Sequence, residues 1–225
     1  ISSIENETKN TLELANEFYQ SGLFDLVEPN FLMKNPRTSG GCPTINCKPN
    51  DTYFDYQWGL RDTGQYVDTV GGDINVCNAW QTTMGSNNVS VAVLDNGVDP
   101  IHPDLKNIHP LSYDVEGNSS PSKIYGDHGT ACAGIIGANA NNDTGVAGIA
   151  PQSPIMSISV DFTNFSPDFQ QRLANGINFA WRNGASIISN SWDLNNNSSI
   201  VNTAIDSALM RGRNGLGSIV VFATG

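Results

Sequence analysis

The chain has 225 residues, of which 39% are hydrophobic and 15% are charged. This composition supplies a sizeable core, and no run approaches the about 18 apolar residues of a membrane span, which argues against disorder and membrane insertion. Twenty-two acidic residues against 11 basic ones give a net charge of −11, which disfavours nucleic acid and anionic lipid as partners.

The N-terminal part of the sequence differs in pattern from the rest. Residues 5–28 show helix-like apolar spacing up to Tyr19 and strand-like alternation from Phe24 to Glu28. This piece is too small to bury its own apolar face, and the residues from Pro29 to Pro49 have the composition of a linker. We therefore expect a tail and linker over residues 1–40 and the main domain over residues 41–225.

From residue 53 onward, strand and helix patterns alternate. The expected strands are Val89–Leu94, Ile155–Val160, Ala185–Trp192 and Ser218–Ala223. Helices are expected to begin at Asp127, at Ser166 (as the N-cap) and at Ile200. Runs of Val and Ile without polar alternation indicate strands buried on both faces. The predicted fold class is α/β, a doubly wound parallel sheet with helical crossovers.

The four cysteines predict one small disulfide ring and one buried thiol. Cys42 and Cys47 flank a four-residue loop and are expected to pair in an oxidising compartment, with free thiols as the alternative. Cys132 lies in an apolar helical pattern, where a cysteine is usually a small buried hydrophobe. A four-cysteine zinc site is disfavoured because the sequence has no Cys-x-x-Cys pair.

Two polar residues stand where a parallel sheet usually binds ligands. Asp95 follows the Val89–Leu94 strand, although Asp-Asn-Gly is also an ordinary turn sequence. His128 opens a helix whose first turns are rich in Gly and Ala, which allows tight packing around an imidazole. A buried carboxylate that accepts from one ring nitrogen would leave the other nitrogen free to take a proton.

The sequence motifs around these two residues resemble those of a known family. The stretch from Val91 to Asp99, followed by His102-Pro103-Asp104-Leu105, resembles the aspartate motif of subtilisin-like serine proteases. The stretch from His128 to Gly134 resembles their histidine motif. Further similar segments are Gln57-Trp58-Gly59-Leu60, Gly145–Pro151, Ser189–Trp192 and Val220–Gly225. These motifs occur in the family's order and cover about residues 50–225.

This resemblance implies roles for particular residues. Asp95 would orient the imidazole, and His128 would act first as general base and then as general acid. Substrate binding is expected at Ser191, Trp192 and Asp193. Asp193 replaces the usual Gly, and its carboxylate would either favour a basic substrate side chain or point to solvent. Asn96 replaces the more usual Ser or Thr, which is a mild change.

The same resemblance implies a nucleophilic serine in a Gly-Thr-Ser segment and an oxyanion-hole asparagine directly after Gly225. Neither occurs in the 225 residues. The expectation is therefore the N-terminal portion of a serine endopeptidase, with the fold incomplete at its C-terminus and the fragment inactive alone. The alternative is a peptide-binding pseudo-protease that does not cut. The reading frame after Gly225 would discriminate the two.

Family resemblance also suggests a structural calcium site, although the loop has ordinary turn composition. Its ligands would be Asp104, Ala140, Asn142, Thr144 and Val146. No cofactor is expected for the chemistry itself. Residues 5–28 resemble the end of a propeptide, so the expected partners are polypeptide substrates and the protein's own propeptide. The expected localisation is secreted, cell-surface or periplasmic, although residues 1–5 show no signal peptide.

Overall fold

The computed structural model describes residues 47–66, 70–193 and 198–224. They all belong to one compact unit, residues 44–225, of the two units into which the chain divides. In these described ranges, no helix is long and apolar enough to cross a membrane. The helix and strand expected over residues 5–28, the linker's main part and the boundary at residue 40 lie outside the described residues, so they stay predictions.

A five-stranded parallel sheet forms the centre of the unit, in the order β2-β3-β1-β4-β5. The strands are β1 (Val91–Asp95), β2 (Tyr113–Asp114), β3 (Ile155–Ser159), β4 (Ile187–Asn190) and β5 (Ile219–Phe222). Four of them lie in the apolar runs expected from the sequence. β2 was not expected, because a two-residue strand has no readable period. The predicted α/β class with a parallel sheet is confirmed.

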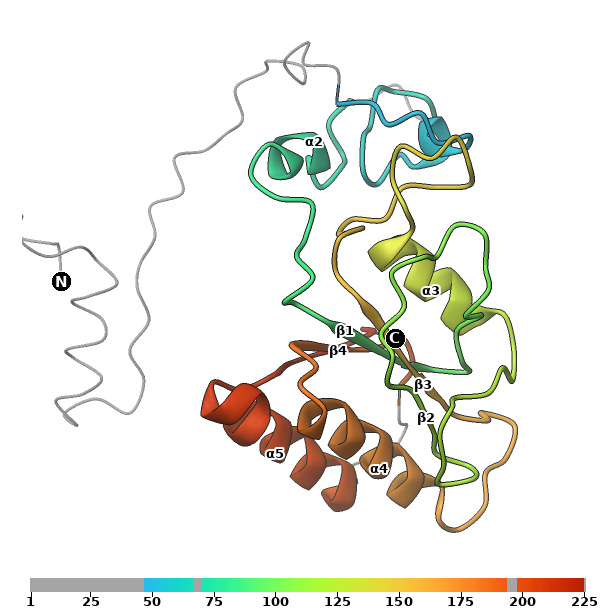
Figure 1. The fold of residues 1–225 in the computed structure, drawn as a ribbon, viewed down its shortest axis with the longest axis vertical. Coiled ribbons are helices and arrows are strands. Elements are labelled where there is room, and N and C mark those ends of the chain that lie inside the picture. The colour runs from blue at the N-terminus through green and yellow to red at the C-terminus, as the bar shows by residue number, and fades with distance from the viewer. Residues whose placement is uncertain (1–46, 67–69, 194–197, 225) are drawn as a thin grey trace, which may run out of the picture. The chain divides into compact units, whose positions relative to one another are not determined.

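Helices cover both faces of the sheet, as Figure 1 shows. The helices α4 (Phe169–Arg182) and α5 (Ser199–Gly215) lie side by side on one face, and α3 (His128–Gly137) packs on the other. Two short helices, η1 (Phe54–Tyr56) and α2 (Val76–Trp80), precede β1. The expected N-cap at Ser166 is wrong: α4 begins at Phe169 after Asp168, and the Ser166 hydroxyl instead contacts Asp168 and Arg172.

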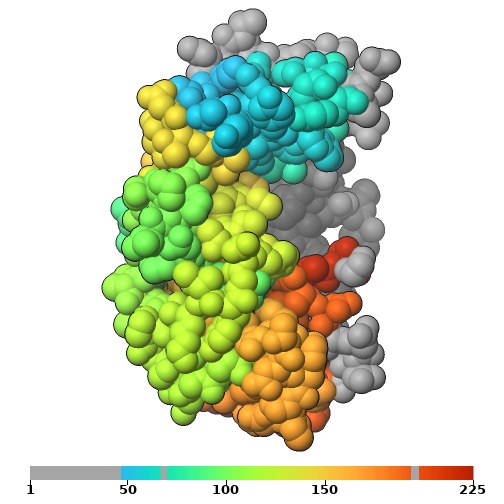
Figure 2. All heavy atoms as spheres, turned by 90° about the vertical axis from the view of Figure 1, so that its right-hand side faces the viewer, coloured from blue at the N-terminus to red at the C-terminus, as the bar shows by residue number. Residues whose placement is uncertain are grey.

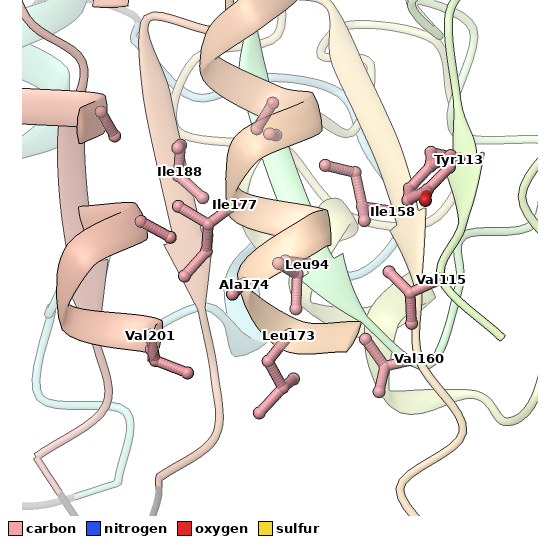
Figure 3. Close-up of a cluster of buried hydrophobic side chains, with 14 of the residues drawn as sticks. Leu94, Tyr113, Val115, Ile158, Val160, Leu173, Ala174, Ile177, Ile188 and Val201 are labelled. Atoms are coloured by element: carbon pink, nitrogen blue, oxygen red, sulfur yellow. The ribbon is translucent and has the colours of Figure 1, made fainter. Parts of the chain in front are cut away.

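The strand alternation divides the core between the two faces. Ala92 and Leu94 point toward α4 and α5, into the cluster drawn in Figure 3 with Leu173, Ile177 and Ile188. Val91 and Val93 instead pack in the cluster on the α3 face. Because β1 is buried on both faces, its C-terminal end is held rigidly in place. Asp95, which follows Leu94, is therefore held in a fixed position as well.

The disulfide prediction is wrong. Cys47 pairs with Cys77 of α2, across 30 residues and with 5.5 Å between the Cα atoms. Cys77 is buried in a small cluster with Phe54 and Val76, so folding brings it to Cys47. Sequence proximity favoured the Cys42–Cys47 ring, but in the structure Cys47 is bonded to Cys77 instead. The bond ties the start of the described chain to α2.

Candidate active site

The site is built where the chain changes direction across the sheet. β1 lies between β3 and β4, with α3 following it on one face and α4 leading to β4 on the other. Ligands of such sheets bind beyond the carboxyl ends of strands at this switch point. Asp95 is the last residue of β1 and lies there, only 1% exposed.

Asp95 and His128 are brought into direct contact. His128 is the first residue of α3, and its Nδ1 lies 2.9 Å from Oδ1 and 3.0 Å from Oδ2 of Asp95. The imidazole side chain is 58% exposed, whereas the carboxylate is buried. A carboxylate accepts only, so it selects the tautomer with the proton on Nδ1 and leaves the Nε2 lone pair free. The pair can therefore serve as a general base.

The contact depends on a close approach between the start of α3 and the turn after β1. A Cβ on Gly129 would lie 2.3 Å from the carbonyl oxygen of Gly97, so only glycine fits there. The N-cap residue Asp127 makes no side-chain cap hydrogen bond. Instead, Oδ1 of Asn96 accepts from the backbone N–H of Gly129 at 2.7 Å, and the N–H of Asn96 donates to Asp95 at 2.8 Å. Asn96 thus joins the two elements that carry the pair.

Cys132 differs from the expected buried hydrophobe. It is half-buried and free, and its Sγ lies 3.8 Å from both ring nitrogens of His128. One helical turn separates the two residues, which places both side chains on one face of α3. Burial raises the pKa of the Cys132 thiol, the Ser191 hydroxyl opposes this rise, and the Asp95 charge adds to it. The i, i+4 spacing from His128 was the signal that the sequence offered.

The expected substrate-binding residues follow β4 and lie in different environments. Ser191 is half-buried and contacts Cys132, and Asp193 is exposed. Trp192 is buried, and its indole N–H donates to the carbonyl of Leu94 at 2.9 Å. The indole therefore supports the end of β1 from the core side. Among the described residues, no serine hydroxyl is hydrogen-bonded to the His128 ring.

The expected calcium ligands form a closely hydrogen-bonded loop. The buried carboxylate of Asp104 accepts from Nδ2 of Asn142 at 2.8 Å and from the N–H of Val146 at 2.9 Å. Oδ1 of Asn142 accepts from the N–H of Thr144. Ala140 lies at the start of the same loop. The structure thus places these residues around one turn, with the Asp104 oxygens occupied by N–H donors.

A second buried carboxylate, which the sequence did not single out, faces the same loop. Oδ2 of Asp51 accepts from the N–H of Asn141 at 2.8 Å, while Oδ1 is buried without a hydrogen-bond partner. In Figure 2 the segment that contains Asp51 (blue) lies against the loop over residues 140–146 (yellow). An unsatisfied buried carboxylate oxygen is costly, and a hard cation would satisfy it. Oδ1 of Asp51 is therefore an oxygen that a Ca²⁺ at this loop would use, which adds Asp51 to the expected ligands.

Comparisons with known proteins agree with this geometry. The profile of the subtilase family, peptidase S8, matches residues 86–225. A thermophilic serine proteinase of Bacillus sp. (strain AK1) is 33% identical over 204 residues, which are 90% of this chain and 44% of that protein. Neuroendocrine convertase 2 of Drosophila melanogaster is 35% identical over 196 residues, which are 80% of this chain and 30% of that protein.

Solved structures show the same relationship. A protease of Pseudoalteromonas arctica has a TM-score of 0.61 at 30% identity, covering 79% of this chain and 59% of that one. The serine protease of Aeromonas sobria has a TM-score of 0.67 at 27% identity, covering 79% of this chain and 32% of that one. The chain spans less than half the length of the two sequence relatives it matches. Because the family profile covers more than half of the chain, the chain belongs to the subtilase family.

Proposed function

We propose that the protein containing this chain is a serine endopeptidase in which Asp95 and His128 supply the acid–base part of a Ser-His-Asp triad. The observation that carries the proposal is the contact of His128 Nδ1 with both oxygens of the buried Asp95 carboxylate. Membership in the subtilase family supports it, as do relatives that are named a serine proteinase and a convertase.

In this mechanism, Nε2 of His128 takes the proton of a serine hydroxyl as its oxygen attacks the peptide carbonyl, and then returns that proton to the leaving amine. Asp95 stays ionised, holds the required tautomer and stabilises the imidazolium that forms. Proton transfer by a positioned side chain contributes about 10²–10⁴-fold in rate. The backbone N–H of Asn96 keeps the carboxylate in place.

The nucleophile is proposed to lie outside the 225 residues, because the sequence has no Gly-Thr-Ser segment. In subtilisin, loss of the serine alone costs about a millionfold in kcat. Loss of an oxyanion-hole donor costs about 10²–10³-fold. The 225-residue chain by itself is therefore proposed to be inactive.

Labelling with a serine-directed fluorophosphonate tests this proposal. A protein that continues past Gly225 through the next motifs should be labelled at one serine, and His128→Ala should abolish rapid labelling. His109→Ala, at a half-buried histidine whose imidazole hydrogen-bonds to Leu111 in its own turn, is the matched control and should label normally. The 225-residue chain should not label. Stoichiometric labelling of that chain, or unchanged labelling of His128→Ala, would contradict the proposal.

The segment after β4 is proposed to bind an extended polypeptide. Ser191 and Asp193 have exposed or half-exposed side chains, whereas the buried Trp192 is proposed to act through its support of the segment. An exposed carboxylate at Asp193 supports a preference for basic side chains. Asp193→Asn should then reduce the ratio of kcat/KM for a Lys-containing peptide to that for a Leu-containing peptide.

We further propose a structural Ca²⁺ held by Asp51, Asp104 and the loop over residues 140–146. The unpartnered Oδ1 of Asp51 supports this site. A secreted localisation is proposed from the Cys47–Cys77 disulfide and the net charge of −11, because disulfides persist in oxidising compartments. The protein's own propeptide is proposed as a further partner.

A further inference from the structure

A buried ion pair lies near the candidate active site but takes no part in the proposed acid–base chemistry. Arg172, in the first turn of α4, pairs with Glu116 of the turn after β2, and their side chains are only 7% and 12% exposed. We propose that Arg172 and Glu116 are positioning residues, which fix the loop over residues 161–168 as one wall of the peptide-binding site. This inference rests on the proposed function, since it concerns the binding of the same substrate.

The ion pair holds the backbone of this β3–α4 loop from two sides. Nη2 of Arg172 donates to the carbonyl oxygen of Asn164 at 2.6 Å and to the Ser166 hydroxyl at 2.8 Å. Oε1 of Glu116 accepts from the backbone N–H of Asp161 at 3.0 Å, and Oε2 accepts from Nδ2 of Asn164 at 2.9 Å. Loops are usually the more mobile parts of a fold, whereas these contacts to buried side chains restrict this loop.

The chemistry of the pair suits positioning better than stabilisation. A buried ion pair is often no more stabilising than apolar side chains of similar volume, so stability alone does not account for this one. A guanidinium donates in a rigid planar fork, which lets Arg172 hold Glu116 and the loop backbone at fixed angles. Its Nε lies 3.6 Å from the exposed Asp168 carboxylate, beyond hydrogen-bond reach, so Glu116 is its main charged partner.

The β3–α4 loop borders the proposed peptide-binding segment. Val160, the residue before the loop, donates its N–H to the carbonyl oxygen of Asp95 at 2.8 Å. The ring of Phe162 lies 6.2 Å from the indole of Trp192, which belongs to the segment after β4. Because β1 lies between β3 and β4, a peptide placed over the end of β1 runs between the loop and that segment (Figure 1).

A wall that is already ordered strengthens binding, because less conformational freedom is lost when the peptide arrives. The loop supplies no group to the proton transfer between the serine, His128 and the leaving amine. Release of the loop should therefore raise KM and leave kcat nearly unchanged. A small reagent that reacts with the serine and does not reach the loop should react at the same rate as before.

The test uses the protein that continues past Gly225. Arg172→Met/Glu116→Leu removes both charges together, so neither is left buried without its partner. Its KM for an extended peptide should rise about 10-fold at nearly constant kcat, while fluorophosphonate labelling keeps the wild-type rate. Arg182→Met, at an exposed arginine in the last turn of the same helix, is the matched control and should have the wild-type KM.

Hydrogen exchange provides a second measurement that does not depend on catalysis. The peptide that covers residues 161–168 should exchange faster in the double variant than in the wild type. Arg172→Lys keeps the charge but not the fork, so its exchange rate and its KM should be intermediate. Thermal unfolding establishes which variants are folded, and Arg172→Lys carries both measurements if the double variant is not.

The outcomes separate this inference from the proposed function. Normal labelling with an unchanged KM, or unchanged exchange of the loop, would overturn this inference and leave the proposed function standing. An equal rise of KM in Arg182→Met, or a labelling rate that falls together with kcat/KM, would also overturn it, because the effect would then be general. Absence of labelling in the wild type would overturn the proposed function, and this inference with it.

Discussion

At the scale of single residues, Asn96 connects Asp95 and His128, the two members of the proposed catalytic pair. Its N–H donates to Asp95 and its side-chain oxygen accepts from Gly129, the second residue of α3. Helix α3 thus receives its N-terminal hydrogen bond from another element instead of from its own N-cap residue. The sequence suggested that Asn96 is only a mild departure from the family's usual Ser or Thr. In the structure, its two hydrogen bonds hold the start of α3, and with it His128, close to Asp95.

We predict that Asn96→Ala lowers the free energy of unfolding by about 1–3 kcal/mol, because it leaves the buried N–H of Gly129 without an acceptor. Urea unfolding measures this loss. Asn96→Asp keeps an acceptor at the helix N-terminus and should retain most of the stability. Equal stability of Asn96→Ala and the wild type would show that water replaces the side chain and that Asn96 does not position α3.

At the scale of elements, the short strand β2 is attached to the loop after it by a buried acidic group. Asp114 is fully buried and accepts from the Tyr125 hydroxyl at 2.9 Å, and it pairs with Lys123 at 2.9 Å. Burial alone would raise the pKa of Asp114, but these contacts and those from Gly117 and Ser159 hold it below its ordinary value. The loop leads directly to His128, so this cluster stabilises the approach to the site.

The same cluster predicts a loss of stability in alkali. Burial, helped by the hydrogen bond to Asp114, raises the pKa of Tyr125 from 10.0 to about 12. The folded pKa is the higher one, so the contribution to stability is complete below pH 10 and is lost as the pH rises to about 12. Urea unfolding at about pH 9 and about pH 11 measures the loss.

Tyr125→Phe is the matched variant for this prediction. It should be less stable than the wild type at about pH 9, by about 1.5–3 kcal/mol, because it lacks a hydrogen bond to a charged group. It should lose less stability than the wild type between the two pH values. Parallel losses in both proteins would assign the alkaline effect to other groups.

At the scale of the whole described unit, the segment before β1 is held to the sheet by distant contacts. Gln57 exchanges two hydrogen bonds with Ala147, and the indole N–H of Trp80 donates to the carbonyl of Ile149. The Cys47–Cys77 disulfide and the proposed calcium site lie in this same region. Loss of either should therefore loosen the N-terminal segment first.

Removal of the disulfide should lower stability by about 3–4 kcal/mol, the chain-entropy value for a loop of this length. The double variant Cys47→Ser/Cys77→Ser should show this loss in urea unfolding under oxidising conditions. Cys42→Ser should show none, because the pairing in the structure leaves Cys42 out. A loss in Cys42→Ser that matches the double variant would restore the Cys42–Cys47 ring.

Calcium removal should also destabilise the unit. A ligand at 100 times its Kd contributes about 2.7 kcal/mol, and each kcal/mol shifts the Tm of a protein this size by about 2–4 °C. EDTA should therefore lower the Tm by about 5–10 °C. Asp51→Asn and Asp104→Asn should abolish the response, and Asp55→Asn, an exposed carboxylate, should keep it. A Tm independent of EDTA would contradict the site.

Much of the sheet could be predicted because strands that are buried on both faces consist of consecutive apolar residues, which can be recognised in the sequence. The strands β1, β3, β4 and β5 lie in runs of Val, Ile and Met that need no partner to be recognised. The two-residue β2 is too short to show an apolar run, and it is defined by its pairing with β3. The motif around His128 likewise marks a helix start by its small residues, and α3 begins there.

The contacts between distant parts of the chain could not be predicted in the same way. Sequence order favoured pairing of Cys47 with its neighbour Cys42, whereas folding buries Cys77 beside it. Cys132 belongs to an apolar helical pattern, yet its helix face meets His128 and Ser191. Asp51 stands in an unremarkable stretch, and only the loop 90 residues later leaves its Oδ1 buried and unpartnered. Local patterns determine which elements form, but a side chain's environment depends on elements that are far away in the sequence.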